Sequence, residues 1–151
     1  MFFGVHGDAT LILRVKDSET SYNGGTGFYI QGQGSNGHVD FELEGFFNSR
    51  YNGGNGMSFL YFSEGEIKVK GVVNIYKNRY VGFRMGGPVN VVVDKRGALN
   101  SCSNDQDGND LEDIYNGGSG TFSGDGYTCG TNGPSGANLP DCKACPSCPD
   151  E

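Results

Sequence analysis

An acidic run in the last third of the chain is the segment best suited to chemistry. The stretch SNDQDGNDLEDIY carries oxygen-bearing groups at alternate positions. In a tight loop such groups point inward together, and carboxylate, amide and backbone carbonyl oxygens are the ligands that Ca²⁺ prefers. The sequence therefore predicts a calcium site formed by Asp105, Asp107, Asn109, Asp113 and the backbone carbonyl of Leu111. A solvated acidic loop is the alternative.

The segment Asp105 to Asp113 resembles the aspartate loops of thrombospondin type 3-like repeats, which follow the pattern D-x-D-G-[DN]-x-[LI]-x-D. This chain has one copy, and Asp110 stands at the sixth position, where glycine is usual. The resemblance implies that the loop binds calcium and that the protein is extracellular.

Five cysteines lie in the same third of the chain, at positions 102, 129, 142, 145 and 148. Disulfides are typical of chains outside the reducing cytosol, and we expect a Cys102–Cys129 bond that brackets the acidic loop. Cys142, Cys145 and Cys148 would supply at least one more disulfide, with the odd sulfur free or bonded to another subunit. The alternative is a metal–thiolate site, in which Cys102 or Cys129 completes the C-x2-C-x2-C run.

Three copies of the sequence Tyr-Asn-Gly-Gly-x-Gly begin at Tyr22, Tyr51 and Tyr115. Asn-Gly and Gly-Gly tolerate positive φ, so the copies are consistent with turns of similar chemistry. Alternatively, the three rings form a shared platform for carbohydrate or for subunit packing. His6 and His38 are the only histidines and lie in no recognisable catalytic or zinc motif. We expect no enzymatic activity.

The segments that must position these candidate residues have the sequence pattern of β-strands. Apolar and polar residues alternate around Leu11 to Val15, and again at Val39, Phe41 and Leu43 and at Ile67 and Val69. This period of two predicts strands with one buried face. With 27 glycines among 151 residues, the pattern predicts an all-β fold, a β-sandwich or jelly roll of about eight short strands with a Gly/Cys-rich C-terminal tail. A β-solenoid is the alternative.

Opposite charges on two of these segments predict a further detail of the sheet. The Val39 segment carries acids on its polar face and the Ile67 segment carries lysines. Opposite charges on neighbouring strands stabilise a sheet, so we expect the two strands to lie side by side.

The charge distribution divides the chain into two parts. Residues 1–100 carry nine acidic and ten basic residues, whereas residues 101–151 carry nine acidic residues and one lysine. We expect an all-β core in 1–100, with the acidic, cysteine-rich region 101–151 packed on it. The lack of a basic stripe argues against nucleic acid as a partner. No apolar run is long enough to insert into a membrane, and MFFGV is too short for a signal peptide.

These features together favour an extracellular or cell-surface module with a structural or adhesive role. We expect a self-associating surface or filament subunit, a homopolymer or homo-oligomer stabilised by calcium and disulfides. The alternative function is a carbohydrate-binding module that uses the loop tyrosines.

Overall fold

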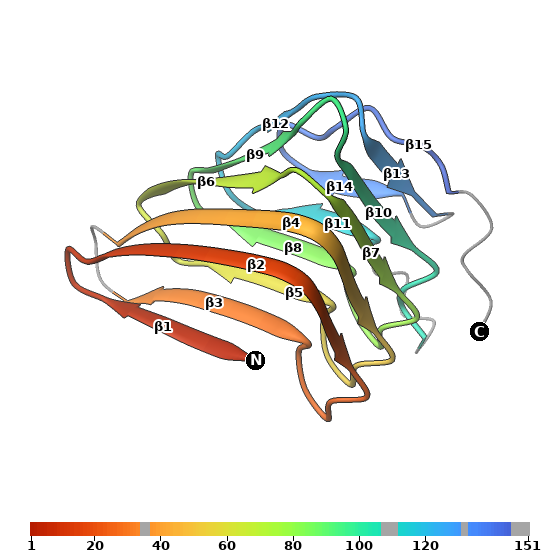
Figure 1. Ribbon diagram of the computed structural model, residues 1–151, viewed down its shortest axis with the longest axis horizontal. Helices are drawn as coiled ribbons and strands as arrows, with labels where there is room; N and C mark the ends of the chain where they lie inside the picture. The colour runs from red at the N-terminus through yellow and green to blue at the C-terminus, as the bar shows by residue number, and fades with distance from the viewer. Residues whose placement is uncertain (34–36, 107–111, 131–132, 146–151) are drawn as a thin grey trace.

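The computed structural model describes residues 1–33, 37–106, 112–130 and 133–145 (Figure 1). Within this part of the chain every strand pairing is parallel and no helix occurs. The strands wind into a β-solenoid of about 5 turns. The prediction of an all-β protein is confirmed. The β-sandwich or jelly roll is wrong, and the alternative of a β-solenoid is correct.

Each coil has three sides, which belong to two sheets. One side is built from β1 (Phe2–His6), β3 (Phe28–Gln33), β5 (Met57–Leu60), β8 (Phe83–Gly86), β11 (Ile114–Asn116) and β14 (Pro134–Gly136). The second side contains β6 (Glu64–Val69), β9 (Val89–Val93) and β12 (Phe122–Ser123). The third contains β7 (Val72–Tyr76), β10 (Ala98–Cys102), β13 (Tyr127–Cys129) and β15 (Lys143–Ala144).

Two long strands, β2 (Thr10–Ser21) and β4 (His38–Arg50), bend and cover the second and third sides together (Figure 1). The first part of β4 pairs with β6 and its last part pairs with β7. The bend lies beside Asp17, which has a φ of 44°, and Gly45, which has a φ of 66°. The carboxylate of Asp17 accepts a hydrogen bond of 3.0 Å from the Phe46 N–H, which ties the two bends together.

The coils repeat every 26 residues, a spacing that local alternation of apolar and polar residues does not reveal. Phe46 lies opposite Val72, and Val72 lies opposite Ala98, so in the central coils equivalent residues are 26 positions apart. Alternation of apolar and polar residues shows only that a strand has one buried face, which sandwiches and solenoids share. The glycine-rich segments between strands turn the corners of a coil instead of closing antiparallel hairpins.

The predicted core residues are buried. Val39, Phe41, Leu43, Ile67 and Val69 are each at most 1% exposed and face the inside of the solenoid. Burial of this kind contributes roughly 1.5–3 kcal/mol for each large apolar side chain. The described part of the chain contains no helix that could cross a membrane.

The expected pairing of the Val39 and Ile67 strands is confirmed, because β4 and β6 are hydrogen-bonded neighbours with Glu42 opposite Lys68. The ion pairs differ from simple cross-strand pairs. Glu42 Oε2 lies 2.8 Å from Lys70 Nζ, while Lys68 pairs with Glu66 of its own strand.

Candidate functional site

A ladder of amide side chains runs inside one corner of the solenoid. The inner amide ladder consists of Asn23, Asn52, Asn78 and Asn104, one from each successive coil. The Nδ2 of each of the first three asparagines donates to the Oδ1 of the next one at 2.9 Å, and that Oδ1 also accepts from the backbone N–H of the same donor residue. Asn52, Asn78 and Asn104 are buried. These polar groups are therefore satisfied although they lie in the buried interior.

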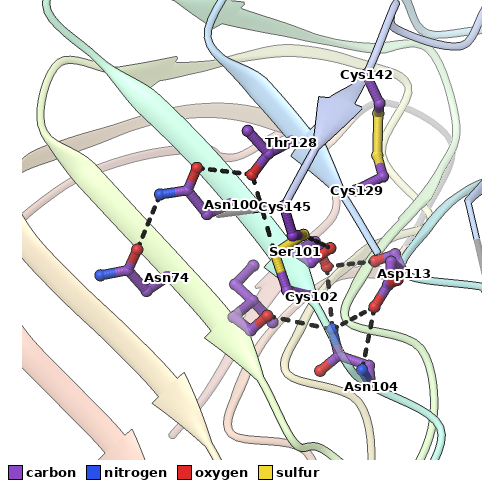
Figure 2. The surroundings of a disulfide bond; sticks show 11 residues. Asn74, Asn100, Ser101, Cys102, Asn104, Asp113, Thr128, Cys129, Cys142 and Cys145 are labelled. Atoms are coloured by element: carbon purple, nitrogen blue, oxygen red, sulfur yellow. Dashed lines mark hydrogen bonds between the residues drawn. A yellow bond between two sulfur atoms is a disulfide. The ribbon is translucent and has the colours of Figure 1, made fainter. Parts of the chain in front are cut away.

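Asp113 ends the inner amide ladder (Figure 2). Its Oδ1 accepts from both the N–H and the Nδ2 of Asn104, at 3.1 and 2.9 Å. The residue is fully buried, and Oδ2 has no hydrogen-bond partner within the described residues. The nearby Gly130 N–H donates to the Ser101 carbonyl at 3.1 Å. Burial raises the pKa of Asp113, and the hydrogen bonds from Asn104 only partly oppose that rise.

This raised pKa predicts a specific pH dependence of stability. The folded protein binds the Asp113 proton more tightly than the unfolded chain, in which aspartate has a pKa of about 3.9. The stabilisation from this group is therefore fully present below the unfolded pKa and is lost as pH rises through the raised folded pKa. We compare the free energies of unfolding of the wild type and of Asp113→Asn. The wild-type value minus the variant value should fall as pH rises from the unfolded pKa through the raised folded pKa.

Urea unfolding at a series of pH values measures that difference. Asp125→Asn is the matched control, because Asp125 is an exposed aspartate of the same region and its replacement should not reproduce the fall. A difference between wild type and Asp113→Asn that is independent of pH, or that rises with pH, would contradict the assignment of Asp113 as a buried ladder end.

The predicted calcium ligands are only partly described. Asp107, Asn109 and Leu111 lie outside the described residues. Asp105 is buried, and Asp113 Oδ1 is engaged by Asn104. Among the residues that the structure describes, no cluster of three or more His, Cys, Asp or Glu side chains could hold a metal ion. Calcium binding by this loop stays a prediction.

The cysteines form disulfides, but the pairing differs from the one expected. Cys102 bonds Cys145, and Cys129 bonds Cys142 (Figure 2). The predicted Cys102–Cys129 bond is wrong because Cys129 lies opposite Ser101 in the parallel pair of β10 and β13. Consecutive residues of a strand point to opposite faces, so Cys102 and Cys129 face away from one another.

The two bonds clip the C-terminal segment to the last coil from both faces. Cys129 belongs to the buried core, where Cys142 packs against it, and Cys102 lies near Thr128, with Sγ 3.9 Å from Oγ1. The expectation that the tail cysteines form disulfides is confirmed for Cys142 and Cys145, although their bonds replace the predicted Cys102–Cys129 bond and do not add to it. The four bonded sulfurs exclude a metal–thiolate site made from them. Cys148 lies outside the described residues. Disulfides are compatible with an extracellular location.

A second row of amides, the outer amide ladder, follows the third side of the coils. Asn100 Nδ2 donates to Asn74 Oδ1 at 2.9 Å and Asn74 Nδ2 donates to Asn48 Oδ1 at 3.1 Å, while Thr128 Oγ1 donates to Asn100 (Figure 2). Both ladders were missed at the sequence level. Their signal is Asn-x-x-x-Asn repeated every 26 residues, at positions 48 and 52, 74 and 78, and 100 and 104.

The structure separates the three predicted binding tyrosines. Tyr22 and Tyr51 occupy equivalent corners, where both have positive φ, and their rings stack with centroids 5.0 Å apart and planes 7° apart. Tyr115 makes no ring contact with either. It lies on β11, where the Arg84 guanidinium lies over its ring, 5.7 Å from the centroid. The third Tyr-Asn-Gly-Gly copy thus belongs to a different side of the coil.

Tyr115 lines a surface groove of about 270 Å³ together with residues of two neighbouring coils. The groove contains a second tyrosine, Tyr80, whose own ring lies 5.5 Å from the Arg79 guanidinium. The remaining lining residues are Asn55, Val81, Arg84 and Glu112. Asn55 comes from the second Tyr-Asn-Gly-Gly-x-Gly copy and Tyr115 from the third, so two of the three copies contribute to one surface.

Comparisons with protein-family models, with curated proteins and with solved structures find no match to this chain.

Proposed function

We propose that this chain is an extracellular carbohydrate-binding module whose ligand occupies the groove between Tyr80 and Tyr115. The observation that carries the proposal is the convergence of two tyrosine rings with Asn55, Arg84 and Glu112 in one open groove. Sugars present apolar C–H faces that pack on aromatic rings, and hydroxyl groups that hydrogen-bond to amide, carboxylate and guanidinium groups. The groove offers both kinds of contact within one surface.

Neighbouring groups hold each tyrosine in place before a ligand binds. The guanidinium of Arg84 lies over the Tyr115 ring and that of Arg79 lies over the Tyr80 ring. The backbone of Tyr80 is held on both sides, because its N–H donates to Gly54 O at 3.3 Å and its carbonyl accepts from the Asp105 N–H at 3.1 Å. A rigid surface loses little conformational entropy when a ligand binds.

The size and charge of the groove narrow the ligand class. A volume of about 270 Å³ lies just below the roughly 300–1,000 Å³ of pockets that enclose drug-sized ligands. This size suits one or two sugar rings at the end of a glycan. The formal charges of Arg84 and Glu112 cancel, so the groove favours a neutral sugar over a uronic acid. The disulfides support an extracellular or cell-surface setting for such a ligand.

Titration with a panel of neutral and acidic oligosaccharides tests the proposal. Tyrosine emission is a direct signal because the chain contains no tryptophan, and calorimetry gives the dissociation constant. Tyr80→Ala and Tyr115→Ala should each weaken binding roughly two- to thirteenfold, since an aromatic contact contributes about 0.5–1.5 kcal/mol.

Tyr22→Ala is the matched control, because Tyr22 is 68% exposed and outside the groove. Its replacement should leave the dissociation constant unchanged. Failure of every oligosaccharide to bind would refute the function. Binding that Tyr22→Ala weakens and the two groove variants do not would instead place the ligand on the stacked Tyr22–Tyr51 pair.

A further inference from the structure

The first coil leaves a long strand edge unpaired within the described structure. Among the residues that the structure describes, β2 pairs only with β4, and β1 only with β3. β2 has 12 residues, whereas β12, β14 and β15 at the opposite end have two or three each. Short strands and a disulfide-clipped segment blunt that opposite end. A long edge that still presents free N–H and C=O groups is a template for pairing with another chain.

The same end of the solenoid exposes apolar side chains. Phe2 is 59% exposed and Ile12 is 70% exposed. Leu11, Leu13 and Val15 pack against the core but are only partly buried. Solenoid coils bury their apolar interior against the next coil, and an end coil needs a polar cap to remain soluble. This end therefore carries both open hydrogen-bonding groups and incompletely covered core.

The charges along β2 specify the orientation of a partner strand. Arg14 and Lys16 precede the bend and Glu19 follows it, while the carboxylate of Asp17, at the bend itself, accepts from the Phe46 N–H of β4. Arg14 and Glu19 pair with Glu42 and Arg50 of β4, at 3.7 and 2.9 Å, but their own side chains stay 75% and 40% exposed. A second β2 running antiparallel places the basic arm against the acidic arm in both directions. A parallel second copy would align like charges.

The shape of the coil is compatible with the same orientation. The bend of β2 lies between its two arms (Figure 1). A two-fold axis through this bend, perpendicular to the solenoid axis, would exchange the two arms and reverse the direction of winding. The same rotation places β1 antiparallel to its own copy on the remaining side. One symmetry operation thus brings all three sides of the open coil against their counterparts, as an isologous contact requires.

We propose that the open edge of the first coil is the contact surface for a second copy of this chain, giving a two-fold dimer in which β2 pairs antiparallel with β2. The dimer continues both sheets across the interface and covers the apolar end of each core. This inference is independent of the carbohydrate site, because β1 and β2 contribute no residue to the groove.

Sedimentation velocity and light scattering of the full chain over a range of concentrations test the dimer. The expected species has twice the mass of one chain and dissociates on dilution. Arg14→Glu combined with Lys16→Glu should weaken the dimer at least about tenfold. Lys95→Glu combined with Arg96→Glu makes the same charge change at exposed positions of the β9–β10 turn and should leave the dimer intact.

Glu19→Lys tests the antiparallel orientation. It should also weaken the dimer, because it places a lysine against the basic arm of the second copy, whereas in a parallel pair it would only replace one like-charge contact with another. Mixing it with the Arg14→Glu/Lys16→Glu chain should restore a dimer that contains one copy of each, which tests that β2 makes the contact. Circular dichroism establishes that the variants remain folded. A wild-type chain that is monomeric at every concentration, or that forms open-ended polymers, overturns the proposal. A dimer unaffected by the β2 variants, or a mixture that does not associate, also overturns it.

Discussion

Replacing Asn78 with alanine is expected to cost about 3–5 kcal/mol of unfolding free energy, because several buried groups lose their partners. Asn78 Nδ2 donates to Ser49 O and to Asn104 Oδ1, at 3.0 and 2.9 Å. Its Oδ1 accepts from the N–H and the Nδ2 of Asn52, at 3.1 and 2.9 Å. No water can take over these contacts if the interior stays closed. Urea unfolding of the two proteins measures the difference.

Asn74→Ala is the matched control for this prediction. Asn74 lies four residues before Asn78 and belongs to the outer amide ladder. Its side chain bonds to Asn48 and Asn100 at 3.1 and 2.9 Å. Its side chain is only half-buried, so water can satisfy the groups left behind, and we expect a loss of about 1 kcal/mol or less. Equal losses in the two variants would show that burial of the inner amide ladder contributes nothing beyond the hydrogen bonds themselves.

The contrast between these asparagines shows which parts of the fold were predictable. Alternation at Val39, Phe41 and Leu43 identified the buried face of a strand correctly, because that pattern depends only on local strand geometry. Whether the next strand pairs parallel one coil away or antiparallel across a hairpin depends on long-range register. That register is encoded by the 26-residue spacing of Asn52, Asn78 and Asn104, which is a repeat signal and not a local one.

The candidate site, like the fold, was predictable only where the signal is local. Of the three predicted tyrosines only Tyr115 lies in the groove, because Tyr22 and Tyr51 fall at equivalent corners of successive coils and stack on each other. Tyr80 belongs to no Tyr-Asn-Gly-Gly copy. It lies one 26-residue repeat after Gly54 of the second copy, and its N–H donates to the Gly54 carbonyl. Local motif matching cannot find such a residue, whereas alignment of the coils does.

Removing the Cys102–Cys145 disulfide is expected to cost about 4 kcal/mol, and removing Cys129–Cys142 about 3 kcal/mol. The closed loops span 43 and 13 residues, and the chain-entropy model assigns a larger stabilisation to the longer loop. Cys102→Ser/Cys145→Ser and Cys129→Ser/Cys142→Ser, each unfolded in urea, measure the two values. Both changes should be made in a Cys148→Ser background, so that no free thiol can exchange with the remaining disulfide.

Serine replacements should add a burial cost at both bonds. Cys102 and Cys129 are 3% and 5% exposed, so a serine at either position adds a desolvation cost to the lost loop constraint. We therefore expect the measured cost of each serine pair to exceed its loop value. Replacement of Cys129 and Cys142 by alanine separates the two contributions, because alanine removes the sulfur bond without burying a hydroxyl. If serine and alanine pairs lose the same stability, only the loop constraint matters. If neither pair loses stability, the C-terminal segment is held by its strand pairing between β13 and β15 and not by its disulfides.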